Sequence, residues 1–160
     1  MKRFVKLYLF YLLLLFGLFY MPVTPLALWL NHLQSSLTLT GLAYFLAPGQ
    51  LQGIDIIINP HYKIIINQAC NGMIPVIFLW ASILAYPSKL LLKLLWMVLG
   101  YAVFSIVNII RILIVVYFVE QEGEQSNFYW SHDLLGNAML MITGLFIFYV
   151  FIKRSSLKTV

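Results

Sequence analysis

The sequence predicts an all-α membrane protein, a four-helix transmembrane bundle with a small outward cap. Hydrophobic residues make up 62% of the 160-residue chain, charged residues only 9%, and the mean hydropathy is +0.93. These values lie far from those of soluble proteins. Four apolar stretches approach the ~20 residues that a helix needs to cross a bilayer. They cover residues 4–20, 69–86, 91–119 and 134–152, within a single membrane domain of residues 1–160.

The basic residues predict which side of the membrane each connection faces. They form three clusters, namely Lys2, Arg3 and Lys6; Lys89 and Lys93; and Lys153, Arg154 and Lys158. Because basic residues accumulate on the cytoplasmic side, both termini and the connection near residue 88 are expected to be cytoplasmic. Residues 21–68 and 120–131 then face outward. The net charge of +5 therefore indicates a multi-pass protein of the cell membrane and not a nucleic-acid partner.

The first stretch has the basic start and apolar run of a secretory signal. No clear cleavage site follows it. Residues 21–25, Met-Pro-Val-Thr-Pro, are instead typical of a loop. We therefore expect an uncleaved membrane anchor.

Residues 21–68 are predicted to form the outward cap. Its apolar residues recur at helical spacing at Leu26, Trp29, Leu30, Leu33 and Leu37, and its polar positions include Asn31, Gln34 and Ser35. That pattern is typical of an amphipathic helix on the membrane surface. Two β-rich runs, residues 54–58 and 62–66, flank a turn-favouring Asn-Pro-His and predict a β-hairpin. The hairpin either delivers the chain to residue 70 or covers the mouth of the bundle, and the two roles are compatible.

Cys70 is the only cysteine, so it cannot form a disulfide or a Cys-Cys metal pair within the chain. A proline is tolerated in the first turn of a helix, so Pro75 predicts that the second helix begins within residues 71–75. The start of a helix lowers the pKa of a nearby thiol and favours the thiolate. Cys70 is therefore either a nucleophile or an inert core residue.

Arg111 lies in the apolar run Val-Asn-Ile-Ile-Arg-Ile-Leu of residues 107–113. An arginine within a membrane costs about 2.5–3.5 kcal/mol on insertion scales and faces a protein interior or a wet cavity. Ser105, Asn108 and Arg111 recur every three residues and share one helix face. Arg111 either faces an outward-opening pocket or extends its side chain to the outer interface.

His132 opens the fourth stretch, again on the outward side, where a histidine either anchors the helix or acts chemically. Cys70, Arg111 and His132 come from three different spans, yet the topology assigns them to one side. A Cys/His pair for acyl transfer needs a shared pocket and no proximity in sequence. No recognisable metal-ligand spacing, phosphate-binding loop or Gly-x-Ser-x-Gly motif occurs, so we expect no metal and no cofactor.

Three segments resemble the exosortase/archaeosortase family of membrane cysteine transpeptidases. They are Ala-Cys-Asn-Gly at residues 69–72, Asn-Ile-Ile-Arg-Ile at 108–112 and His-Asp-Leu-Leu-Gly at 132–136. The resemblance covers residues 64–152 and includes the order Cys, Arg, His. The chain is shorter than many members, which carry extra spans before this core, and Asn71 stands where many have Ser or Ala.

The resemblance implies a cysteine peptidase/transpeptidase that cleaves a C-terminal sorting signal from secreted proteins and transfers them to an envelope acceptor. Such a signal consists of a short motif, a transmembrane helix and a basic tail. Catalysis would fall to Cys70, Arg111 and His132, with Asn71, Asn108 and Asp133 as supporting or substrate-binding residues. The competing interpretation is a non-catalytic membrane assembly or transporter subunit in which Arg111 binds lipid or a partner helix.

Overall fold

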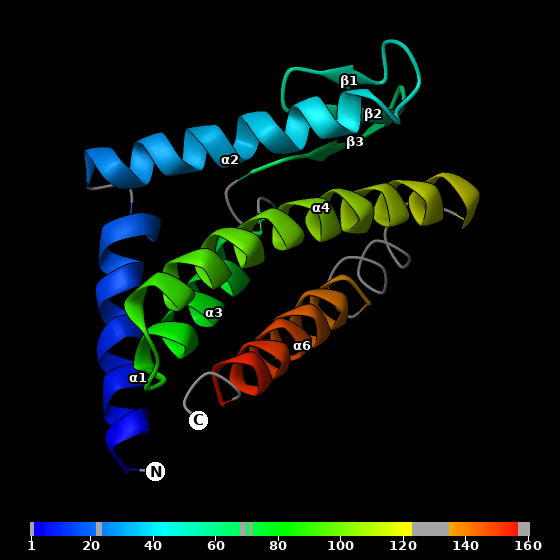
Figure 1. Ribbon diagram of the computed structural model, residues 1–160. Helices are drawn as coiled ribbons and strands as arrows, with labels where there is room; N and C mark the ends of the chain where they lie inside the picture. Colours follow the sequence, from blue (N-terminus) through cyan, green and yellow to red (C-terminus); the bar gives the residue numbers. More distant parts are fainter. Residues whose placement is uncertain (1, 22–23, 68–69, 71, 123–134, 157–160) are drawn as a thin grey trace.

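The computed structural model describes residues 2–21, 24–67, 70, 72–122 and 135–156 (Figure 1). This part of the chain is mostly helical and carries one small antiparallel sheet. The elements follow in the order α1 (Lys2–Leu15), the short π-helix η1 (Phe16–Tyr20), α2 (Pro25–Ala43), β1 (Leu51–Gln52), β2 (Asp55–Asn59), β3 (Tyr62–Ile65), α3 (Met73–Ala85), α4 (Leu90–Glu122) and α6 (Asn137–Ser156).

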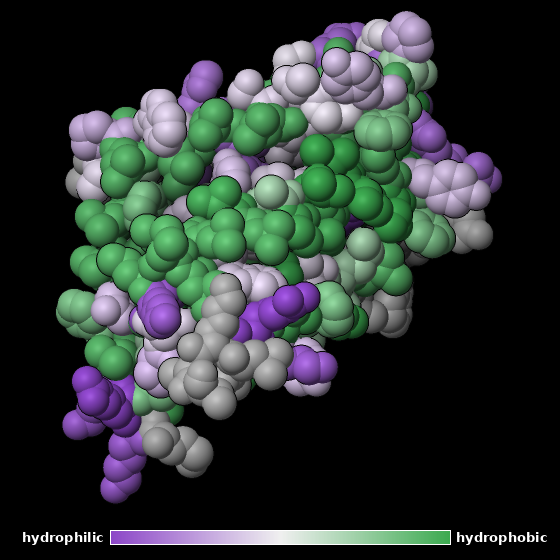
Figure 2. Space-filling model, in the orientation of Figure 1, coloured by the Kyte–Doolittle hydropathy of each residue, from purple (hydrophilic) through white to green (hydrophobic). Residues whose placement is uncertain are grey.

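Three helical segments in the described part are long and apolar enough to cross a membrane. They are Lys2–Tyr20, Leu90–Gln121 and Asn137–Ser155. Hydrophobic side chains cover a broad band of the face seen in Figure 2, and hydrophilic ones gather mainly near its margins. The chain is therefore a membrane protein with several apolar helices.

The predicted second span differs from the other three because its helix is short. α3 has 13 residues, about 20 Å at 1.5 Å per residue, whereas a hydrocarbon core is about 30 Å thick. Gly72 caps its start in the left-handed conformation, with φ 75°, and Pro75 lies in its first turn. Tyr86 is extended and precedes Pro87, which stops the helix. The start at Met73 falls within the predicted interval of residues 71–75.

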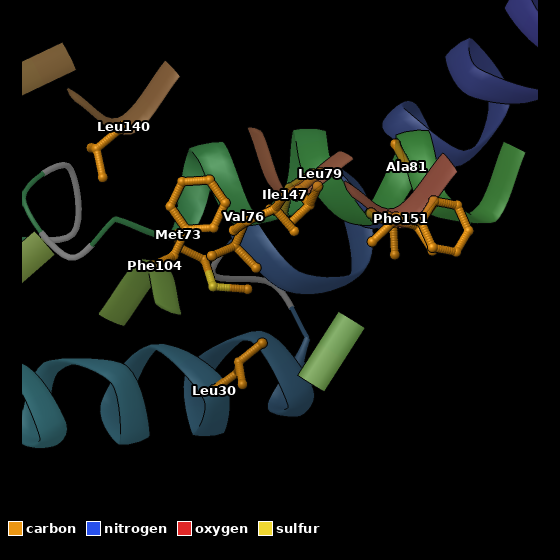
Figure 3. Close-up of a cluster of buried hydrophobic side chains, with 12 residues drawn as sticks. Leu30, Met73, Val76, Leu79, Ala81, Phe104, Leu140, Ile147 and Phe151 are labelled. Atoms are coloured by element: carbon orange, nitrogen blue, oxygen red, sulfur yellow. The ribbon is translucent and has the colours of Figure 1, made fainter. Parts of the chain in front are cut away.

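α3 is surrounded by other helices. It packs against α1, α4 and α6. Figure 3 shows side chains of α3, α4 and α6, with Leu30 of α2, in the main hydrophobic cluster. α3 therefore lies among other helices, and its short length follows from the residues at its two ends.

α4 is the overlong span. Its 33 residues extend about 50 Å, well beyond a hydrocarbon core. The excess packs beside the sheet, as Figure 1 shows, in a second cluster formed by Leu42, Ile56, Ile64, Ile66, Cys70, Ile112, Val115, Val116 and Val119. The predicted β-rich runs form β2 and β3, which pair antiparallel. β1 pairs with the other edge of β2, so β2 is the central strand.

α2 is a helix in the region where the sequence pattern predicted one. Thr24 caps its start by accepting a hydrogen bond from the backbone nitrogen of Ala27 at 3.1 Å. Gln34 is fully buried against α4, whereas Trp29 is exposed. Polarity alone did not reveal the burial of Gln34, because its partner Ser105 lies on α4. The position of α2 on a membrane surface stays a prediction.

Candidate functional site

Arg111 lies buried in the middle of α4, with 3% of its surface exposed. Its guanidinium donates from Nη1 to Oδ1 of Asn108 at 3.3 Å and from Nη2 to Oδ1 of Asn137 at 3.5 Å. Asn108 lies one turn earlier on α4, and Asn137 is the first residue of α6. The cation thus connects two helices and lies in the protein interior.

Asn108 connects Arg111 to the segment that carries Cys70. Its side chain is fully buried, at 0% exposed, and its Nδ2 donates to the backbone carbonyl of Cys70 at 2.9 Å. The same amide accepts from Arg111 through Oδ1. Because one rigid amide makes both contacts, it fixes the position of the Cys70 backbone relative to the guanidinium.

Cys70 is 8% exposed and belongs to the cluster formed by the sheet and the distal part of α4. Its backbone nitrogen donates to the carbonyl of Asn67 at 3.0 Å, and its Sγ lies 4.0 Å from the carbonyl oxygen of Ile65. The residue follows β3 and precedes α3 by three positions. The hairpin therefore leads the chain to Cys70, which is one of the two roles predicted for it.

Two glycines allow the polar groups to lie this close to the backbone. A Cβ on Gly72 would lie 3.0 Å from Cγ of Asn108, and a Cβ on Gly136 would lie 2.5 Å from Nε of Arg111. Real Cβ atoms do not approach other atoms that closely, so any other residue at position 136 would displace the guanidinium. Both glycines belong to the segments that carried the family resemblance.

Ser105 shares the polar side of α4 but has a different partner. Its hydroxyl lies 3.0 Å from the carbonyl oxygen of Tyr101 and 3.3 Å from Oε1 of Gln34 on α2. Ser105 and Gln34 therefore hold α2 on α4. Of the three residues predicted to share one helix face, Ser105 contacts α2, whereas Asn108 and Arg111 contact each other.

A cavity of about 630 Å³ lies between α3 and α6 and reaches Arg111. Gly72, Arg111 and Asn137 border it, together with apolar residues such as Phe104. Asn137 is exposed, so its amide is accessible where Arg111 meets the cavity. The arrangement offers a buried cation and an accessible amide beside an apolar space, and Gly72 on its border lies two positions from Cys70.

Three of the six predicted site residues fall in the described part of the chain, and they lie together. Cys70, Asn108 and Arg111 form one hydrogen-bonded group through Asn108. The predictions for Asn71, His132 and Asp133 lie outside the described residues.

Sequence reasoning missed Asn137 as a site residue. The available signal was its place directly after the His-Asp-Leu-Leu-Gly segment, at the polar start of an apolar stretch. An asparagine there is an ordinary helix-start residue as well. Only the contact with Arg111 distinguishes the two roles.

Comparison with known families adds a finding about the whole chain. The model of the family described as transmembrane exosortase matches residues 2–149. No curated protein and no solved structure matches the chain. The family match extends N-terminally beyond the resembling segments, through the hairpin and α2 to α1, and it covers most of the sequence. The chain therefore belongs to the transmembrane exosortase family.

Proposed function

We propose that the protein is a membrane-embedded cysteine peptidase/transpeptidase that removes a C-terminal sorting signal from secreted proteins and transfers them to an envelope acceptor. The observation that carries this proposal is the hydrogen-bonded group of Cys70, Asn108 and Arg111. It joins the only cysteine of the chain to a buried cation at the end of an apolar cavity. Family membership supports the same chemistry.

Cys70 is the proposed nucleophile. Its thiolate attacks the carbonyl carbon of the scissile peptide, a C–S bond forms and the C–N bond breaks. His132 gives a proton to the departing amine. It then takes a proton from the incoming acceptor, which attacks the thioester and releases the thiolate. The net result is transfer of the acyl group from the amine to the acceptor.

Arg111 is the proposed electrostatic group. In the acyl-transfer transition state the carbonyl oxygen becomes negative, and a fixed cation in a site that excludes water stabilises that charge strongly. Asn108 holds Arg111 and the Cys70 backbone together. Asn71 and Asp133 are proposed to support Cys70 and His132, and Asp133 would orient the imidazole.

The proposal includes a topology. α1 with η1, α3, α4 and α6 form a four-helix bundle in the cell membrane, within a single domain. α2 and the sheet form a cap on the outward face, and both termini are cytoplasmic because the basic clusters lie at the termini and between α3 and α4. The site then faces outward and meets the secreted substrate. Membrane lipid surrounds the bundle.

The C-termini of envelope proteins test this function in the native host. Mass spectrometry compares hosts that carry wild-type protein or Cys70→Ala at equal abundance. The proposal predicts that the variant host accumulates proteins that keep an apolar helix and a basic tail. Unchanged C-termini in both hosts would favour the non-catalytic membrane subunit.

A further inference from the structure

α6 separates two apolar grooves, and only one of them reaches the site. The α3/α6 groove, of about 630 Å³, runs along α3 from Gly72 to Ser82 and ends at Arg111 and Asn137. The α4/α6 groove, of about 480 Å³, lies between α4 and the other side of α6. Its residues from Trp96 to Val150 are apolar except for Thr143. Both grooves are therefore bordered by α6, but only the α3/α6 groove ends at polar side chains, those of Arg111 and Asn137.

The shape of the α3/α6 groove suits the side of a helix. Its length along α3 is ten residues, about 15 Å. Dividing about 630 Å³ by this length gives a mean cross-section of about 42 Å², roughly half that of a helix about 10 Å in diameter. A helix half embedded in the groove would fill it, whereas a single acyl chain is thinner.

The groove is open beside its outer part and closed at its other end. Phe4 of α1 stacks on Phe148 of α6 with ring centroids 6.4 Å apart, and Tyr8 and Phe148 border the groove. From that contact α1 and α6 run apart, as Figure 1 shows. Met141 and Leu145 on the rim are 62% and 64% exposed. An apolar segment can therefore enter sideways from the bilayer, but the closed end limits its contact to about 15 Å.

Resting on the function proposed above, we propose that the α3/α6 groove binds the outer half of the substrate's transmembrane helix. About ten residues of that helix, the ten that follow the cleavage motif, fill the groove. Their outer end then lies at Arg111 and Asn137, next to Gly72, so that the preceding peptide bond meets the segment that carries Cys70. The groove therefore sets the distance between the apolar helix and the cleaved bond.

Photo-crosslinking from neighbouring positions on α6 tests this inference. Met141 and Leu145 border the α3/α6 groove, whereas Ile142 and Phe146 border the α4/α6 groove and are equally exposed. A photoreactive amino acid replaces each residue in turn in the Cys70→Ala background. The probe is a tagged secreted protein that keeps its C-terminal helix in the Cys70→Ala host. We expect crosslinks from 141 and 145 to the first ten residues of its helix and none from 142 or 146.

Activity gives an independent measurement in the protein that keeps Cys70. Met141→Trp, which narrows the α3/α6 groove, is expected to lower processing of the same tagged protein about tenfold or more. Ile142→Trp on the other groove should leave processing within about twofold, with both proteins present at wild-type levels in the membrane. A chimaera with a bulky outer half of the substrate helix should be processed poorly, and one with a bulky inner half normally.

The outcomes separate this inference from the proposed function. Three results would overturn the groove assignment while wild type still processes the probe. They are crosslinks of equal strength from both grooves, crosslinks from 142 and 146 alone, and only lipid adducts at 141 and 145. Each of them would leave the proposed peptidase activity intact. If the wild-type host fails to process any tagged protein, the proposed function is overturned, whatever the crosslinks show.

Discussion

α4 carries two cations, Lys93 near its start and Arg111 in its middle, and their surroundings differ. Nζ of Lys93 donates to the carbonyl of Leu84 at 2.7 Å, in the last turn of α3. A cation at the carbonyl end of a helix satisfies an otherwise free acceptor and favours the helix dipole. Lys93 is also partly exposed, as expected for a basic side chain near the end of a span. The packing of α3 on α4 accounts for Lys93 entirely.

Arg111 also connects two helices, but through contacts of another kind. The acceptors identified for its guanidinium are side-chain amides of Asn108 and Asn137, and not a helix end. One of these amides also holds the Cys70 carbonyl, and the other faces the α3/α6 groove. A cation within a span therefore indicates a functional site when its partners also contact a candidate nucleophile and a groove.

The largest effect is expected when Arg111 is changed. Arg111→Ala should lower processing of the tagged secreted protein about 100- to 1,000-fold, because the developing negative charge loses its fixed cation. Arg111→Lys should recover only a small part, since one ammonium group cannot replace the fork that contacts two asparagines. If Arg111→Ala processed the substrate at the wild-type rate, Arg111 would be a structural cation like Lys93.

Asn108→Ala is expected to have the next largest effect. It leaves the buried carbonyl of Cys70 without its donor, which costs about 1–3 kcal/mol, and it releases one side of the guanidinium. We expect processing to fall at least tenfold and thermal stability in detergent to fall modestly. Ser105→Ala is the matched control on the same helix, because it removes the hydroxyl's contacts with Gln34 of α2 and with the Tyr101 carbonyl and none with Cys70 or Arg111. Equal losses in the two variants would mean that Asn108 is structural only.

Gly136→Ala tests the placement of Arg111 without removing it. The added methyl group would lie 2.5 Å from Nε, so the guanidinium must move away from it. We expect this displacement of the cation to lower processing about tenfold. Gly17→Ala is the control, since nothing lies within 4 Å of its added Cβ. Processing by Gly136→Ala as fast as by Gly17→Ala would mean that the position of the guanidinium does not matter.

Lys93→Met should give the smallest effect. The variant loses one hydrogen bond to the Leu84 carbonyl, worth about 1 kcal/mol, and keeps the apolar stem. Processing should stay within about twofold of wild type, while thermal stability in detergent falls slightly. A loss of processing as large as that of Arg111→Ala would show that any cation in α4 matters equally.

Much of the local structure was predictable from sequence because local chemistry determines it. Pro75 in the first turn of α3 and the turn between β2 and β3 are encoded within a few residues, and both occur where expected. Family membership was also foreseen, from the three short segments. The hydropathy pattern indicated a membrane protein, although it could not show that α3 is only 13 residues long.

The long-range contacts were not predictable from the sequence. Asn108 and Cys70 lie 38 positions apart, and no local pattern indicates that the amide of one meets the carbonyl of the other. Asn137 was overlooked because it also suits a helix start, and the burial of Gln34 was not foreseen because its polar partner Ser105 lies on another helix. In each case the side chain's role depends on what another segment presents to it.

The covalent intermediate tests the central claim that Cys70 attacks the substrate. Purified His132→Ala protein is incubated with the tagged secreted protein, and intact-mass spectrometry looks for an adduct on Cys70 that hydroxylamine releases, as it does for a thioester. We expect an adduct with the mass of the substrate lacking its sorting signal, and no adduct when Cys70→Ala is combined with His132→Ala. No adduct on His132→Ala, while wild type processes the same substrate, would contradict the covalent mechanism.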